Sequence, residues 1–110
     1  MTTAQPAPLP QIDAAQAVEV ITGFIGSQMA QTGFSRLVVG LSGGVDSATT
    51  AYLAVRAAGA DSVLGVRMPY RTSSPESEAD ALAVVEALGC RTERVDISSM
   101  VDPMLALKTD

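Results

Sequence analysis

An aliphatic run that ends in a glycine-rich turn constrains the fold of this chain more than any other feature of its sequence. The run "RLVVGL", residues 36–41, is short and β-branched, as is typical of a strand buried in a parallel sheet. After "SGGV" comes "DSATTAYLAVRAAG", a predicted helix with Ala48, Ala51, Tyr52 and Val55 inward and Gly59 as its stop. A strand, a glycine-rich turn and a helix predict the first part of a βαβ unit.

Further helices and strands are predicted around this unit. Helices are expected from Asp13 to about Gln31 and over residues 76–89, and a last one begins near residue 98. Ser73 or Ser74 can cap the helix at 76–89, with Glu76 completing a capping box on Ser73. Strands are expected over 61–69 and 91–97. This alternation predicts an α/β fold with a doubly wound parallel sheet, whose ligand binds at the carboxyl ends of the strands.

The 110 residues allow one domain, and their composition indicates a buried core. The prolines of "PAPLP" predict a disordered, extended tail over residues 1–11, so the domain should occupy residues 12–110. The helix predicted from Asp13 carries two apolar strips. It therefore either buries a second side against another subunit or is an ordinary buried helix.

Charge and cysteine content exclude several classes of partner. The net charge of −5, without a run of either sign, argues against nucleic acid or an anionic membrane surface. No apolar run approaches the roughly 18 residues that cross a bilayer, and the first residues do not resemble a signal peptide. The single cysteine, Cys90, cannot form an internal disulfide, so a cytoplasmic location and a buried, inert thiol are expected.

The turn "GLSGGVDS", residues 40–47, predicts a phosphate site without a lysine. Its glycines fit neither the dinucleotide fingerprint nor the Walker loop, and the one lysine of the chain is Lys108. Glycines let the backbone approach a ligand closely, and the amides at a helix N-terminus attract an anion. The hydroxyls of Ser42 and Ser47 can add hydrogen-bond donors.

Asp46 indicates that a divalent cation takes part. A carboxylate in the first turn of a helix favours the helix dipole but repels a phosphate. The repulsion disappears if Mg²⁺ lies between them, because Mg²⁺ prefers one or two carboxylates together with phosphate oxygens. Asp46 is therefore a candidate metal ligand. In the alternative interpretation, Ser42 and Asp46 only form the turn and the helix cap.

Two segments carry a resemblance to known families. "SGGVDS" directly after "VVGL" resembles the pyrophosphate loop of the N-type ATP pyrophosphatases, which cleave ATP between its α and β phosphates. "VLGVRMPYRTSSPESEADALAVVEALG", followed by "VDISSMVD", is similar to the NAD synthetases within that superfamily. The resemblance extends over about residues 12–107 and implies a fold like that of the adenine nucleotide alpha hydrolases.

The resemblance also implies a set of site residues. The residues expected to bind ATP are Gly40, Leu41, Ser42, Gly43, Gly44, Val45, Asp46, Ser47 and Arg67, with Asp46 also on Mg²⁺. Arg67 can equally be an arginine on the surface at a strand end. Arg71 and Ser73 in the adjoining loop are further candidates.

In the NAD synthetases, the carboxylate of deamido-NAD attacks the α-phosphorus of ATP, and ammonia, free or derived from glutamine, then displaces AMP. The resemblance thus implies a homodimeric carbon–nitrogen ligase with ATP as co-substrate and with no catalytic nucleophile or base to assign. Family members are considerably longer, so this sequence should hold the ATP-binding part, with an incomplete sheet and no turnover on its own. Two alternatives are another pyrophosphatase of the superfamily, such as a GMP synthetase-like or tRNA-modifying enzyme, and a nucleotide-binding module without catalysis.

Overall fold

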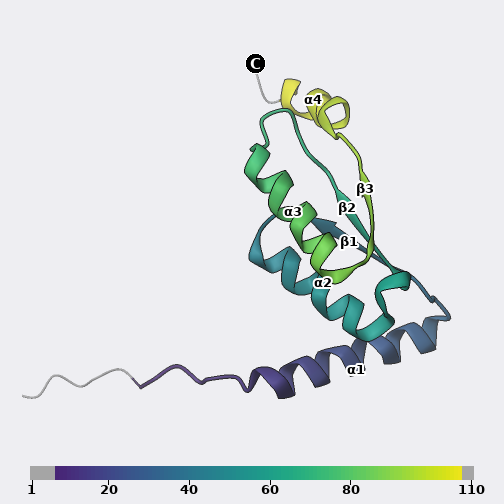
Figure 1. Ribbon diagram of the computed structural model, residues 1–110. Helices are drawn as coiled ribbons and strands as arrows, with labels where there is room; N and C mark the ends of the chain where they lie inside the picture. Colours follow the sequence, from purple (N-terminus) through teal and green to yellow (C-terminus); the bar gives the residue numbers. More distant parts are fainter. Residues whose placement is uncertain (1–6, 108–110) are drawn as a thin grey trace, which may run out of the picture.

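The computed structural model describes residues 7–107, which form a parallel three-stranded sheet with flanking helices (Figure 1). The strands β1 (Leu37–Leu41), β2 (Val63–Arg67) and β3 (Arg91–Arg94) lie in the order β1-β2-β3. The helices are α1 (Ala14–Thr32), α2 (Val45–Ala58), α3 (Pro75–Leu88) and α4 (Ser98–Ala106), and a 3₁₀ turn, Ala60–Ser62, precedes β2. The predicted parallel α/β fold is confirmed, and every predicted helix and strand is present.

The tail predicted over residues 1–11 lies partly outside the described residues. Residues 7–11 are exposed and belong to no helix or strand. Across the described residues, no helix has both the length and the apolar character needed to cross a membrane.

Local side-chain contacts explain where the helices begin and end. Asp13 caps α1 by accepting a hydrogen bond from the Gln16 amide, and α1 ends at Gly33 in the left-handed region. Ser74 caps α3 by accepting from the Ser77 amide at 3.1 Å. The predicted capping box on Ser73 is wrong, because the Ser73 hydroxyl accepts from the Tyr70 amide and closes the preceding turn instead.

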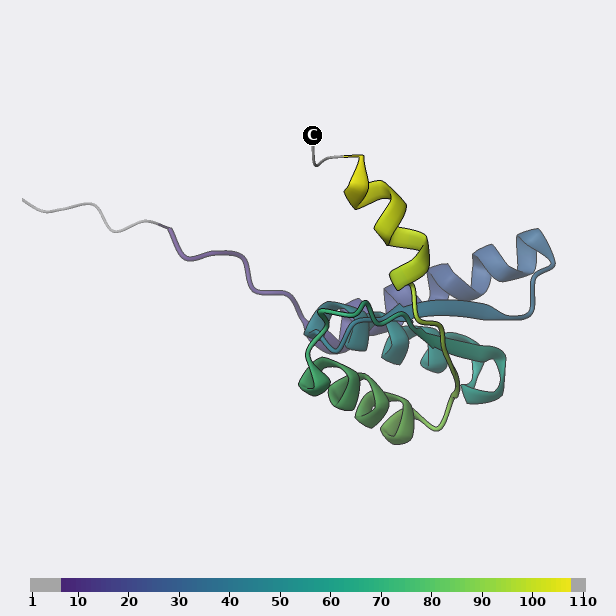
Figure 2. The same ribbon diagram turned by 90° about the horizontal axis from the view of Figure 1, so that it is seen from above.

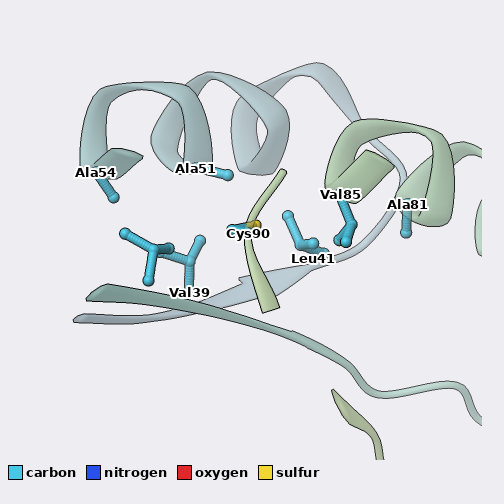
Figure 3. Packing of buried hydrophobic residues seen from close by; sticks show 8 residues of the cluster. Val39, Leu41, Ala51, Ala54, Ala81, Val85 and Cys90 are labelled. Carbon is cyan, nitrogen blue, oxygen red and sulfur yellow. The ribbon is translucent and has the colours of Figure 1, made fainter. Parts of the chain in front are cut away.

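The core lies between the sheet and two helices that cover the same face. Figure 2 shows α2 and α3 together on one side of the sheet. In Figure 3 alanines of both helices point toward the strands, because a methyl group lets a helix approach a sheet closely. The buried residues are Val39, Leu41, Ala51, Ala54, Val63, Ala81, Val85 and Cys90. Cys90 is buried as predicted, whereas Tyr52, predicted inward, is 43% exposed.

The other face of the sheet has no helix packed on it within residues 7–107. Val38 on this face is 70% exposed, and its β2 partner Leu64 is half-buried. The first helix, α1, packs mainly against α2 and buries none of its residues completely, so Val20 and Phe24 remain 64% and 63% exposed. The described residues thus form a sheet with one covered face and an apolar open face.

Adjacent valines of β1 allow a direct test of this arrangement. Val39→Ala should lower the free energy of unfolding by about 1.5–3 kcal/mol, because it removes buried methyl groups. Val38→Thr on the open face should change it by less than about 0.5 kcal/mol and reduce aggregation. Denaturant unfolding and light scattering of the two variants measure both effects. Equal destabilisation by the two substitutions would contradict the assignment of the faces.

Candidate functional site

The glycine-rich turn connects the carboxyl end of β1 to α2 and is closed by its own serines. The Ser47 hydroxyl oxygen accepts a hydrogen bond from the Ser42 amide at 3.1 Å and donates to the Gly44 carbonyl at 3.2 Å. The Ser42 hydroxyl accepts from the Gly44 amide at 3.3 Å, and the two hydroxyl oxygens lie 3.1 Å apart. Two residues predicted to contact a ligand therefore also hold the shape of the loop.

Gly43 is required by both its backbone conformation and its surroundings. Its φ is +84°, a region that other residues rarely adopt. A Cβ atom at this position would lie 2.4 Å from the carbonyl oxygen of Ser77, in the first turn of α3. The loop thus packs directly against α3, and its position depends on that helix.

The residue at the N-cap of α2 provides no side-chain acceptor for the first-turn amides, and the Ser42 hydroxyl accepts from the amide of that residue, Gly44, itself. The side chains of Asp13 and Ser74 cap α1 and α3, whereas Gly44 at the start of α2 has no side chain to do so. First-turn amides and the helix dipole favour an anion at such an end. Val45 and Asp46 are exposed in the same turn.

Asp46 is suited to a cation that is shared with a ligand. Within residues 7–107 there is no group of three or more His, Cys, Asp or Glu side chains that could hold a metal. A metal at Asp46 would therefore need most of its ligands from elsewhere. Mg²⁺ meets this condition, because it usually keeps several waters and takes one or two carboxylates together with phosphate oxygens.

A cavity of about 180 Å³ adjoins the loop at the carboxyl ends of β1 and β2. It is bounded by the ends of these strands, the β2–α3 loop and the first turns of α3. The lining residues are Leu41, Ser42, Arg67, Met68, Pro69, Ser73, Ser77, Glu78 and Ala81. The cavity and the open end of α2 thus lie on either side of one short loop.

Arg67 forms part of the cavity wall. Its side chain is only 15% exposed, its Nε donates to the Thr92 hydroxyl at 3.1 Å, and its Nη1 lies 3.6 Å from Oε1 of Glu78. Arg67 does end β2, as both interpretations of it expected, and its side chain is largely covered. A contact between this guanidinium and ATP stays a prediction.

Glu78 connects the first turn of α3 to two strands. Its Oε1 accepts a hydrogen bond from Nε of Arg94 and pairs with Arg67. The hydrogen bond from Arg94 is the main cause of a lowered Glu78 pKa, and the charges of both arginines add to it against the effect of desolvation.

Glu78→Gln should therefore destabilise the fold in a pH-dependent way. Because the Glu78 pKa is lower in the folded state, its stabilising effect is complete above the unfolded-state pKa of about 4.3 and is lost as the pH falls through the folded-state pKa. The Tm difference between the parent and Glu78→Gln should be constant near neutrality and shrink below about pH 4. Glu86→Gln, an exposed change on the same helix, is the control. A difference that does not vary with pH would contradict the ion pairs.

The β2–α3 loop also contacts α4. The Tyr70 hydroxyl donates to Oδ1 of Asp102 at 2.7 Å, and Nη2 of Arg71 donates to Oδ2 of the same carboxylate. The hydrogen bond to Asp102 is the main cause of a raised Tyr70 pKa. Arg71 is recognisable as a candidate from the sequence, whereas Asp102 and Thr92 are not, because both meet their partners only through the order of the strands.

The predicted ATP-binding residues form one continuous segment and one separate arginine. Residues 40–47 make up the end of β1, the loop and the first turn of α2, and Arg67 lies across the cavity at the end of β2. Leu41 is 6% exposed, so its side chain serves mainly the core. Ser73 lines the cavity, whereas the guanidinium of Arg71 turns toward Asp102.

Sequence comparison finds close similarity to one family. A family model described as NAD synthase matches residues 17–109. The NH(3)-dependent NAD(+) synthetase of Chlorobium phaeovibrioides is 51% identical over 84 residues, which are 76% of this chain and 30% of the relative. That of Methanococcoides burtonii is 46% identical over 92 residues, which are 83% of this chain and 35% of the relative. The chain thus spans about a third of the length of these curated relatives.

Solved structures show the same fold. NH3-dependent NAD synthetase from Campylobacter jejuni matches with a TM-score of 0.79 and 28% identity, over 90% of this chain and 43% of that one. The glutamine-dependent NAD+ synthetase from Acinetobacter baumannii, solved in complex with adenosine diphosphate, matches with a TM-score of 0.81 and 31% identity. That match covers 94% of this chain and 20% of the other.

Proposed function

The chain belongs to the NAD synthase family, and on this premise we propose that it is the ATP-binding part of a ligase that converts deamido-NAD to NAD. The observation that carries the proposal is the open N-terminus of α2 beside a cavity at the carboxyl ends of two parallel strands. Both features lie on one glycine-rich loop, at the place where sheets of this kind bind nucleotides.

We assign the phosphates of ATP to the loop and its nucleoside to the cavity. The amides of Gly43 and Val45 would hold the phosphates, supported by the dipole of α2, while the Gly44 amide between them donates to the Ser42 hydroxyl. Arg67 would contact the nucleotide from the cavity wall, where Thr92 and Glu78 already fix its guanidinium. A similar protein bound to adenosine diphosphate supports an adenine nucleotide as the ligand.

Asp46 is our candidate for the magnesium ligand. Its exposed carboxylate lies in the turn whose amides would face the phosphates. When bound, Mg²⁺ neutralises phosphate charge and polarises the phosphate that is attacked. In this chain Asp46 would orient the ion, and the loop amides would orient the phosphates.

The reaction we propose proceeds in two steps. A carboxylate oxygen of deamido-NAD attacks the α-phosphorus of ATP, the bond to the β-phosphate oxygen breaks, and pyrophosphate leaves. Ammonia then attacks the carbonyl carbon of the adenylate, loses a proton and releases AMP as the amide forms. Positioning and fixed dipoles can supply most of the catalysis. The ammonia is either free or derived from glutamine, since relatives of both kinds share this fold.

We also propose that α1 forms a contact with a second subunit. Its exposed Val20, Ile21 and Phe24 lie on a helix that residues 7–107 leave largely uncovered. Burial against a second copy would remove this apolar surface from water.

Pyrophosphate release tests the proposed activity. A protein that continues this sequence with the rest of the family's domain should release pyrophosphate from ATP only with Mg²⁺, ammonia and deamido-NAD together. Release driven equally well by xanthosine monophosphate or aspartate would instead assign it to another pyrophosphatase of the superfamily.

The main alternative is a nucleotide-binding module without catalysis. The loop and the cavity that support nucleotide binding would serve such a module equally well. The 110-residue chain alone should then bind ATP, and the extended protein should bind ATP without releasing pyrophosphate under any of these conditions.

A further inference from the structure

Polar contacts hold the β2–α3 loop to α4, and the residues that make these contacts do not line the cavity. One carboxylate, that of Asp102, accepts from both the Tyr70 hydroxyl and the Arg71 guanidinium, with a different oxygen for each. The Arg71 amide donates to the Ser98 hydroxyl at 3.0 Å. These partners are 27 to 32 residues apart in sequence, so the contacts fix tertiary structure rather than a local turn.

The Asp102 carboxylate fixes the side chains of two consecutive residues, Tyr70 and Arg71. The Arg71 guanidinium carbon lies 5.8 Å from the centre of the Tyr70 ring, within the range of a cation–π contact. Tyr70, Arg71 and Asp102 therefore all contact one another. Because charge-assisted hydrogen bonds are directional, releasing Asp102 frees both side chains together.

The ordered loop bounds the cavity beside the phosphate loop. The Tyr70 amide donates to the Ser73 hydroxyl at 2.9 Å, and the Ser73 amide donates to the Tyr70 carbonyl at 2.8 Å. The position of Ser73 therefore depends on the position of Tyr70. Pro69 and Ser73, on either side of this turn, line the cavity wall. Asp102 does not line the cavity, yet it is connected to Ser73 through two hydrogen-bonded steps, and Pro69 directly precedes Tyr70 in the chain.

We propose that Asp102 is a positioning residue for the nucleotide site, acting from α4 through Tyr70 and Arg71 on the wall formed by Pro69 and Ser73. The inference rests on the proposed function in taking this cavity as the nucleotide site. Both partners of the ion pair are largely exposed, and exposed pairs add little to global stability. The effect should therefore appear in the order of the loop and in ligand affinity, with little change in Tm.

Limited proteolysis tests the positioning role without any ligand. Trypsin cleaves after arginine, so cleavage of the Arg71–Thr72 bond reports opening of the loop, and cleavage after Arg56 in α2 reports opening of the domain. Asp102→Ala should speed cleavage after Arg71 at least about threefold while cleavage after Arg56 stays unchanged. Asp80→Ala, which removes an exposed aspartate of α3, is the matched control and should change neither rate. Equal rates in the parent and Asp102→Ala, or a parallel rise at both bonds, would overturn the proposal.

ATP titration of the same proteins tests the link to the site. Asp102→Ala should weaken ATP binding about threefold or more, and Asp102→Glu should recover part of the loss because it restores an acceptor for both donors. Asp102→Asn keeps an acceptor but loses the charge, so its ATP affinity should lie between those of Asp102→Ala and Asp102→Glu. This variant also covers the case in which the alanine variant misfolds. If the parent binds no ATP, the proposed function fails while the proteolysis result still decides whether Asp102 orders the loop. If the parent and Asp102→Ala bind ATP equally although the loop opens, the positioning role is wrong.

Discussion

Gly43→Ala should destabilise the domain by about 2–5 kcal/mol and abolish measurable ATP binding. The methyl group meets two independent costs. A φ of +84° disfavours any L side chain by about 1–2 kcal/mol. The contact of 2.4 Å with the Ser77 carbonyl must be relieved by moving the first turn of α3, and overpacking of this kind costs about 1–3 kcal/mol. Denaturant unfolding measures the loss of stability, and titration with ATP measures the loss of binding.

Other glycines of the chain separate the two costs. Gly33 has a φ of +77° and Gly89 one of +71°, and a Cβ atom at either would have nothing within 4 Å. Gly33→Ala and Gly89→Ala should therefore show only the conformational cost, about 1–2 kcal/mol. Gly44 has a negative φ, and a Cβ atom there would lie at an ordinary 3.5 Å from the Ser42 hydroxyl oxygen. Gly44→Ala should therefore leave stability nearly unchanged. If Gly43→Ala costs no more than Gly33→Ala, then the loop does not pack on α3.

The order of elements was predictable because it depends on local chemistry. Gly59 and Gly89 end α2 and α3 where the sequence predicted, and the buried run after residue 36 forms the first strand of a parallel sheet. The resemblance to the NAD synthetases, read from the loop and from the segment after β2, agrees with the family match over residues 17–109. These features need only neighbouring residues to be recognised.

The errors concern choices that tertiary packing decides. Helical spacing groups Tyr52 with Ala51 and Val55, but the buried residues of α2 are Ala51 and Ala54, whose methyl groups allow a close approach to the sheet, and Tyr52 is left 43% exposed. Ser73 and Ser74 are equivalent as caps in sequence, but only Ser74 lies where its hydroxyl meets the Ser77 amide. The local pattern did not single out Ala54, and it offered both serines as caps without choosing between them.

The partners of the site residues depend on the order of the strands. Arg67 reaches Thr92 because β2 pairs with β3, and Arg71 reaches Asp102 because the chain leaves β3 beside the β2–α3 loop. Alternating helices and strands predict a parallel sheet but do not state which strands are neighbours. The sequence therefore indicated Arg67 and Arg71, whereas their acidic partners Glu78 and Asp102 are identified only by the fold.

Asp46→Asn should weaken ATP binding in the presence of Mg²⁺ by about tenfold or more and change metal-free binding much less. Replacing groups that only support a metal ligand typically costs 10- to 100-fold in metal affinity, so the loss of a ligand charge should cost at least as much. The amide keeps the size of the side chain and its place in the first turn of α2. Loss of the carboxylate also weakens the interaction with the helix dipole, but it removes a charge that repels phosphate when no metal is present.

A matched variant isolates the metal effect from the charge effect. Glu76→Gln removes a carboxylate from the first turn of α3, which is capped by Ser74 and has no proposed metal, so it should alter neither Mg²⁺-dependent nor metal-free binding. ATP affinities of the parent and both variants, with Mg²⁺ and with a chelator, give the comparison. Equal loss for Asp46→Asn under both conditions would mean that Asp46 acts only on the loop and the helix end. A loss confined to Mg²⁺ would place the missing positive charge of this lysine-free loop on a cation held by Asp46.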